Sequence, residues 1–234
     1  MTRRAQLLLV LSSFVVACGG DDGVPHVPGE CIAFDEQRGE GTYYDATGAG
    51  ACSFDVQTGG GELLVAAMNA PQFAGSSVCG MCAHVVGPSG EVTVRIVDLC
   101  PECARGDLDL SPQAFDHVAE RSLGRVPITW REVPCDVSGP IEWRIKEGSN
   151  PWWTAVQVRE HRHRIARVER LTAEGDWVEV PRVDYNFFVD ETGFGEGPYT
   201  LRAIDVHGNV LEDTGIELRE AVDQPGAAQL PTCE

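Results

Sequence analysis

Two short segments hold the residues whose types and spacing suggest chemistry. The first is Asp98–Cys103 (DLCPEC), closely followed by Asp107–Pro112 (DLDLSP), so carboxylates stand in and beside a loop that two cysteines can close. The second is the adjacent pair Trp152-Trp153. Carboxyl groups can exchange protons or hydrogen bonds with sugar hydroxyls, and flat indoles offer a rigid apolar surface to the C–H faces of sugar rings. The combination predicts a protein that handles a polysaccharide.

Asp109 is the first candidate among the carboxylates. A leucine lies on each side of it. If a neighbouring wall partly removes it from water, its pKa rises and it can donate a proton or a hydrogen bond. The alternative is a carboxylate that caps the helix expected to begin at Ser111-Pro112. Asp98 ends a strand-like run, and its alternative is an ordinary turn carboxylate.

Both tryptophans can face solvent only if they lie in a loop, because neighbouring residues of a strand point to opposite faces. Gly148 and Pro151 favour a loop here. The alternative is that one indole belongs to the core.

The elements that position these residues are mainly strands. Residues 31–135 are rich in glycine and cysteine, with short strand-like runs and one helix capped by Ser111, which is typical of a small β-barrel. Residues 136–222 hold many short alternating strands separated by turns, which is typical of a β-sandwich. Residues 223–234 are expected to form a C-terminal tail.

The first residues indicate export. Residues 1–17 combine arginines with a short apolar run, as a signal peptide does, and Val15–Cys18 is similar to a bacterial lipobox. We therefore expect lipidation at Cys18 and a flexible tether over 18–30, with the protein anchored to the outer membrane or cell surface. The alternative is an ordinary cleaved signal and a secreted protein.

Charge and cysteine content narrow the class further. The 234-residue chain has a formal net charge of −18, which argues against nucleic acid and anionic membranes as partners. An exported chain with an even set of cysteines besides Cys18 predicts disulfides, although the pairing cannot be read from the sequence. These cysteines are Cys31, Cys52, Cys79, Cys82, Cys100, Cys103, Cys135 and Cys233. A zinc ribbon at the two C-x2-C pairs is the alternative. We expect no metal and no cofactor, and we expect His161 and His163 at the surface.

Several motifs, in order along the chain, resemble those of microbial expansins. They are Gly41–Tyr44, Val97–Pro101, Asp107–Pro112, Arg144–Ser149 and Asp184–Asn186. The resemblance covers roughly residues 39 to 222. It implies a six-stranded double-psi β-barrel followed by an immunoglobulin-like β-sandwich that binds cellulose, and it implies loosening of plant cell walls without hydrolysis.

The resemblance also implies roles for single residues. Asp109 matches the general acid of related endoglucanases, and it is essential in expansins although they do not hydrolyse. The other matching groove residues are Asp98, Thr42 and Tyr44. The matching aromatic platform is Trp152, Trp153 and Tyr185, with Lys146 as a further polar contact. Cys100 departs from the family, which often has a tyrosine there, and this puts one sugar contact in doubt.

Other functions remain open at this stage. Asp45 lies near where hydrolases keep a catalytic base, so an endoglucanase with Asp109 as acid and Asp45 as base is one alternative; inverting enzymes hold the two carboxyls about 6.5–9.5 Å apart. A peptidoglycan lytic transglycosylase, similar to the rare lipoprotein A family, needs only the acid. A pure cell-wall binding module is the third. We expect a monomer whose partner is cellulose or a related β-glucan.

Overall fold

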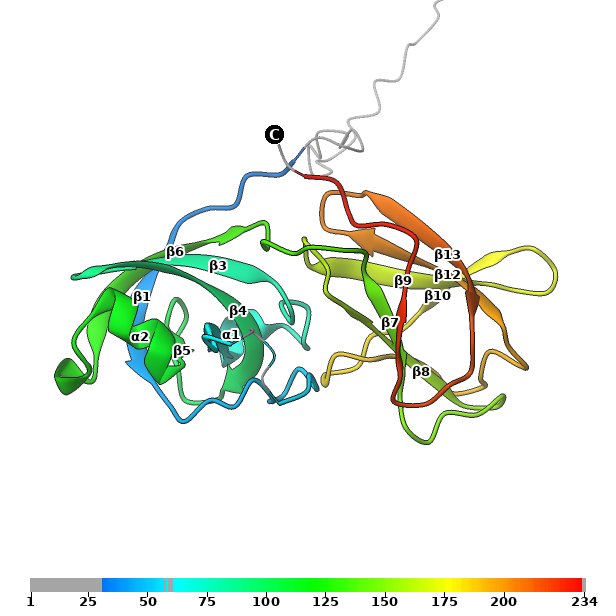
Figure 1. The fold of residues 1–234 in the computed structure, drawn as a ribbon, viewed down its shortest axis with the longest axis horizontal. Coiled ribbons are helices and arrows are strands. Elements are labelled where there is room, and N and C mark those ends of the chain that lie inside the picture. Colours follow the sequence, from blue (N-terminus) through cyan, green and yellow to red (C-terminus); the bar gives the residue numbers. More distant parts are fainter. Residues whose placement is uncertain (1–30, 57, 59–60, 233–234) are drawn as a thin grey trace, which may run out of the picture.

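A computed structural model describes residues 31–56, 58 and 61–232 (Figure 1). The signal peptide, the lipidation at Cys18 and the tether lie outside these residues. The described chain is all-β, with a closed six-stranded barrel followed by two four-stranded sheets. Within the described residues, no helix is long and apolar enough to cross a membrane.

The barrel strands follow the order β1-β5-β2-β4-β3-β6. Their bounds are β1 (Gln37–Tyr43), β2 (Val65–Asn69), β3 (Cys82–Gly87), β4 (Gly90–Cys100), β5 (Leu108–Leu110) and β6 (Val126–Val133). Strand β1 runs parallel to β5 and β2 runs parallel to β4, while the other neighbours are antiparallel. The expected double-psi β-barrel is confirmed.

Two short helices and one 3-10 turn lie on the barrel: α1 (Ala70–Phe73), α2 (Pro112–Val118) and η1 (Arg121–Leu123). The expected cap of α2 is present, because Ser111 Oγ accepts a hydrogen bond from the Ala114 amide at 3.2 Å. The same hydroxyl donates to the Leu63 carbonyl at 2.6 Å. Phe115 and Val118 are buried in the barrel core. The cap and the apolar face therefore fix α2 directly after β5.

Three disulfides are seen among the described residues: Cys52–Cys79, Cys82–Cys135 and Cys100–Cys103. Cys31 is disulfide-bonded as well, whereas Cys18 and Cys233 lie outside the described residues. The zinc-ribbon alternative was wrong, because its four cysteines belong to three separate disulfides. The described part of the chain also contains no cluster of three or more His, Cys, Asp or Glu that could hold a metal.

The second part is a β-sandwich with sheet orders β10-β9-β12-β13 and β11-β8-β7-β14. Its strands are β7 (Glu142–Ile145), β8 (Thr154–Arg159), β9 (Ile165–Leu171), β10 (Trp177–Val180), β11 (Phe188–Asp190), β12 (Tyr199–Asp205), β13 (Val210–Ile216) and β14 (Asp223–Pro225). Residues of both sheets, such as Trp143 of β7 and Leu201 of β12, share one buried core.

The expected tail beginning at residue 223 was wrong. Strand β14 pairs antiparallel with β7, and Leu230 is fully buried in the sandwich core. Gln224 fixes the segment by donating to the Glu217 carbonyl at 3.0 Å. The physical reason is that β7 would otherwise expose an unpaired edge, which β14 covers.

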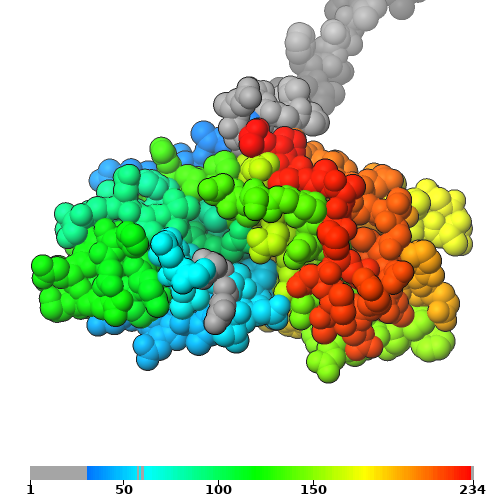
Figure 2. Space-filling model, viewed as in Figure 1, coloured from blue at the N-terminus to red at the C-terminus, as the bar shows by residue number. Residues whose placement is uncertain are grey.

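The barrel and the sandwich touch along the middle of the molecule (Figure 2). Gln157 and Asn186 of the sandwich both donate side-chain hydrogen bonds to the Cys52 carbonyl, at 3.0 and 3.2 Å. Arg159 binds Asp55 of the barrel at 2.6 Å. Several of these partners are buried, so the two parts are joined by a polar interface rather than by the linker alone.

The expectation of surface histidines at 161 and 163 was wrong. His161 is 2% exposed and His163 is 4% exposed. A Cβ added at Gly80 of the barrel would lie 2.5 Å from His161 Nε2, so the ring sits tightly against the barrel backbone. His161 is covered by the barrel, whereas His163 packs edge to face against His207 of the sandwich, with ring centroids 4.5 Å apart.

Candidate functional site

A groove in the barrel begins at the parallel pair β1–β5, whose register sets Thr42 opposite Asp109. Thr42 Oγ1 donates a hydrogen bond to Asp109 Oδ1 at 2.5 Å. In β5 the flanking Leu108 and Leu110 are buried in the core while Asp109 is half-buried. The alternation of a strand therefore turns the carboxyl away from the core and toward Thr42.

The surroundings of Asp109 raise its pKa above the ordinary value. Burial is the largest cause, because it disfavours the charged form. The hydrogen bond from Thr42 opposes this effect, whereas the nearby charge of Glu102 adds to it. Asp109 is thus disposed to keep a proton, which is what a hydrogen-bond donor or a general acid requires.

Asp98 lies near the end of β4 and has a clear structural role. Its Oδ1 accepts hydrogen bonds from the amides of Ala51 and Leu99, at 2.7 and 2.8 Å. A Cβ at Gly50 would lie 2.3 Å from Asp98 Cγ, so the loop can come this close only with glycine there. Asp98 therefore ties the loop after β1 to the end of β4.

Tyr44 connects the two carboxylates. Its hydroxyl is buried and makes no hydrogen bond within 3.5 Å to the described residues. Burial, followed by the negative charges of Asp98 and Asp109, raises its pKa. A buried hydroxyl without a hydrogen-bond partner is costly, so an acceptor that reached it would be stabilising.

Nine residues line the pocket around Asp109, a hollow of ≈ 240 Å³. They are Glu40, Thr42, Tyr43, Cys100, Glu102, Cys103, Asp107, Asp109 and Arg125. Sequence reasoning gave no role to Glu102 or Arg125. The only signal for Glu102 was its place between two cysteines, and none pointed to Arg125. Asp45 is exposed and, like Asp98 and Tyr44, does not line this pocket.

Trp152 is the most exposed large apolar side chain of the sandwich, at 75%. It lies in the expected loop, between β7 and β8. Hydrogen bonds hold the loop in place. The Trp152 amide donates to Asn150 Oδ1 at 3.0 Å, and the amide of Gly195, in the loop between β11 and β12, donates to the Pro151 carbonyl at 2.9 Å. An exposed indole on such a loop is presented to solvent without being needed by the core.

Trp153 and Tyr185 are half-buried and pack against one small apolar cluster with Ala155, Phe187 and Val189. The rings of Tyr185 and Phe187 have centroids 6.0 Å apart. Trp153 and Tyr185 thus pack against the same cluster, and Trp152 precedes Trp153 in the chain. Lys146 lies at the other end of the same loop, and its amide donates to the Ala155 carbonyl at 2.9 Å.

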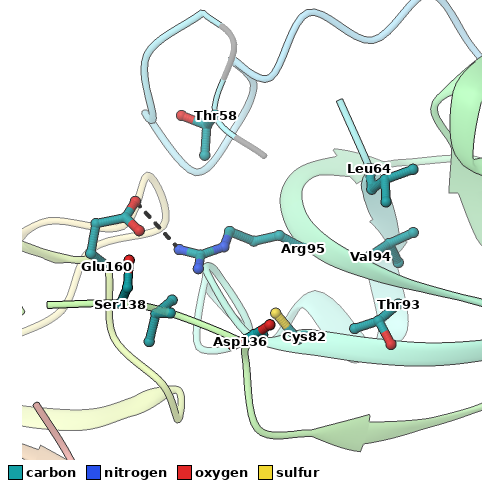
Figure 3. Close-up of a pocket in the computed structure, with 10 residues that line it drawn as sticks. Thr58, Leu64, Cys82, Thr93, Val94, Arg95, Asp136, Ser138 and Glu160 are labelled. Carbon is teal, nitrogen blue, oxygen red and sulfur yellow. Dashed lines mark ion pairs between the residues drawn. The ribbon is translucent and has the colours of Figure 1, made fainter. Parts of the chain in front are cut away.

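A larger hollow, of ≈ 530 Å³, lies at the junction of barrel and sandwich (Figure 3). Arg95 of β4 points across it toward Glu160, with 3.7 Å between the charged groups. None of the residues expected to bind sugar lines it. We assign the candidate site to the smaller groove and the tryptophan loop, because Asp109 with three further carboxyl groups lines that groove and the exposed Trp152 ring lies on that loop.

Known proteins are similar to this chain in three comparisons. Residues 36–130 match the sequence profile of a family described as lytic transglycolase. Expansin-YoaJ of Bacillus subtilis (strain 168) is 40% identical over 161 residues, covering 67% of this chain and 68% of that protein. Expansin-like protein 2 of Dictyostelium discoideum is 30% identical over 197 residues, and the chain spans 48% of its length. A solved structure of a mutant Clavibacter michiganensis expansin in complex with cellohexaose has a TM-score of 0.78 and 29% identity, covering 83% of this chain and 98% of that one.

Proposed function

The chain belongs to the expansin family, and from this premise we propose that it binds cellulose or a related β-1,4-glucan and loosens plant cell-wall polysaccharide without hydrolysis. The Clavibacter relative was crystallised with cellohexaose, a short β-1,4-glucan. We further propose that the protein is exported and anchored through Cys18, and that it acts as a monomer.

The observation that carries the binding proposal is the 75% exposure of Trp152 on an ordered loop. Large aromatic side chains are seldom left this accessible beside two other partly exposed rings unless they meet a ligand. In the proposal, Trp152, Trp153 and Tyr185 hold the apolar faces of successive glucose rings, and Lys146 contacts a hydroxyl.

The groove then acts on a neighbouring glucan strand. Protonated Asp109 donates a hydrogen bond to a sugar oxygen, while Tyr44 offers its hydroxyl proton and Asp98 accepts from a sugar hydroxyl. These contacts compete with those between glucan strands, so the strands slip. No bond breaks, and no water-activating base is required.

The test is a cellulose pull-down with a parallel assay of released reducing ends. Wild type should bind and release no sugar. Trp152→Ala should weaken binding about tenfold, which corresponds to about 1.4 kcal/mol, and should leave stability within about 0.5 kcal/mol because the side chain is exposed. Leu123→Ala, an exposed apolar residue of the barrel, is the matched control. Equal binding by wild type and Trp152→Ala would contradict the proposed platform.

Wall extension under load separates loosening from binding. Asp109→Asn should bind cellulose like wild type but should no longer extend wall strips. If Asp109→Asn kept full extension, the role of the groove carboxyl would be wrong. If wild type bound cellulose and extended nothing, the protein would be a binding module.

A second candidate function is peptidoglycan lytic transglycosylation. The match of residues 36–130 to the lytic transglycolase profile favours it, together with the raised pKa of Asp109, since one acid suffices for that reaction. Purified peptidoglycan incubated with the protein would then yield soluble fragments with anhydro ends, and Asp109→Asn would yield none. Steady release of reducing ends from cellulose would instead indicate an endoglucanase.

A further inference from the structure

One carboxylate of the groove lacks a compensating partner. Within the described part of the chain, Glu102 makes no hydrogen bond or ion pair, although it lines the same pocket as Asp109. The other acidic groups are engaged. Glu40 is paired with Arg125, Asp107 Oδ1 accepts from the Glu40 amide at 2.8 Å, and Asp109 accepts from Thr42.

The position of Glu102 is set by covalent and backbone constraints. The Cys100–Cys103 disulfide closes the turn that carries it, and the Cys103 amide donates to the Cys100 carbonyl at 3.4 Å. On the far side of the turn, the Ala104 amide donates to Asp107 Oδ2 at 3.1 Å. The turn therefore holds an exposed, solvated carboxylate at the edge of the groove.

We propose that Glu102 is a specificity-determining residue, whose unpaired carboxylate makes the groove accept neutral sugar rings and reject uronates. The inference rests on the proposed function and names the class of sugar that the groove takes. The pocket lining has four carboxyl groups and one arginine, and that arginine already binds Glu40. A uronate carboxylate would meet like charge, whereas a glucose ring would not. The net charge of −18 acts in the same direction at longer range.

The same charge acts on Asp109. Glu102 is the first of the neighbouring charges that raise the pKa of Asp109, after burial. A negative group beside Asp109 favours its protonated form, which donates to a neutral sugar oxygen. Glu102 therefore serves both effects from one position: it repels an anionic ring and it keeps the proton on the group that binds a neutral one.

The experiment compares cellohexaose with hexagalacturonate at pH 7 and low salt, by calorimetric titration of the whole exported chain. Glu102→Gln should raise the affinity for hexagalacturonate about tenfold and change that for cellohexaose less than twofold, and the gain should shrink in 0.5 M salt. Glu174→Gln, which removes the same charge from the exposed β9–β10 turn of the sandwich, should change neither. If Glu102→Gln preferred cellohexaose over hexagalacturonate by the same factor as wild type, the inference would be overturned and the proposed function would stand.

A ligand-free measurement completes the test. The carboxyl carbon of Asp109, followed by NMR in a pH titration, should titrate at lower pH in Glu102→Gln than in wild type. The Cys100→Ser, Cys103→Ser double variant should show the same direction, because the open turn no longer holds Glu102 in place. An unchanged midpoint in Glu102→Gln would overturn the effect of Glu102 on Asp109, whereas the sugar comparison decides its effect on uronates. Failure of wild type to bind cellohexaose would refute the proposed function, while the titration would still decide whether Glu102 acts on Asp109.

Discussion

Thr42 and Asp109 form a short polar contact in the groove, with 2.5 Å between Oγ1 and Oδ1. The threonine hydroxyl donates to the carboxylate and so favours the charged form, while burial favours the neutral form and prevails. The pKa of Asp109 therefore depends on two opposing effects, its burial in β5 and the hydrogen bond from Thr42 of β1. Neither residue determines it alone.

Removal of the Thr42 hydroxyl should shift that balance. In Thr42→Val the carboxylate loses a donor, so the pKa of Asp109 should rise further above its ordinary value. If protonated Asp109 performs the loosening, activity is present below this pKa and is lost as pH rises through it. The variant should then stay active to higher pH. NMR titration of Asp109 and wall extension at several pH values test this, with Thr200→Val of the sandwich as control. A lower midpoint in Thr42→Val would contradict the expected direction.

At the scale of elements, the groove depends on the close approach of β1 and the turn before β5. A Cβ at Gly106 would lie 2.0 Å from the Arg38 carbonyl oxygen, and Gly106 has φ +95°. The turn that carries Asp107, and the strand that carries Asp109, can lie against β1 only because residue 106 has no side chain. The backbone contact, rather than any side chain, brings Thr42 opposite Asp109.

Gly106→Ala should therefore destabilise the protein more than its positive φ alone explains. Gly175→Ala is the matched control, because Gly175 has φ +92° and no heavy atom would lie within 4 Å of its added Cβ. We expect about 1–2 kcal/mol for Gly175→Ala, from backbone strain, and about 3 kcal/mol or more for Gly106→Ala, from strain plus overlap. Urea unfolding measures both. Equal costs would mean that the barrel relaxes around residue 106 without loss.

At the scale of the whole molecule, His161 lies at the junction of the barrel and the sandwich. It is completely buried, and burial followed by the charge of Arg95 lowers its pKa from 6.5 to about 3. Its Nδ1 has no hydrogen-bond partner among the residues that the structure describes. The junction thus holds a neutral imidazole that the unfolded chain would protonate in mild acid.

This difference makes stability depend on pH. The folded pKa lies below the unfolded one, so the stabilisation is complete above pH 6.5 and falls as pH drops toward 3, by up to about 1.4 kcal/mol per unit. His161→Gln should lack this component. Urea unfolding at pH 7, 6, 5 and 4 should show a smaller loss for His161→Gln than for wild type. His117→Gln, at an exposed position of α2, should behave like wild type. Identical slopes in all three proteins would show that His161 is solvated.

The arrangement of the whole molecule also bears on the proposed anchor. In Figure 1 the chain enters the barrel at the end where the C-terminus lies, and the loop between β7 and β8 lies at the opposite edge. The segment that follows β1 runs along that same opposite edge. The described chain therefore begins on the side away from the tryptophan loop, and the proposed anchor would be joined to it from there.

The sequence by itself was enough for the features that depend on local pattern. The leucines on each side of Asp109 indicated a carboxyl that could be partly removed from water, Ser111-Pro112 indicated the start of α2, and Gly148 with Pro151 indicated that Trp152 lies in a loop. These predictions succeed because strand alternation, capping and turn chemistry act over a few residues. The motif order was likewise enough to indicate the family and both folds.

Only the tertiary structure decided the features that depend on distant partners. Glu102 lines the groove on a turn that a disulfide closes, and Arg125 lines it from the residue before β6. His161 is buried because the barrel covers it. Residues 223–225 form β14 because β7 lacks another edge partner. The cysteine pairing is of the same kind. Apart from the Cys100–Cys103 turn, the environment is supplied by residues distant in the sequence, so no local pattern in the chain carries it.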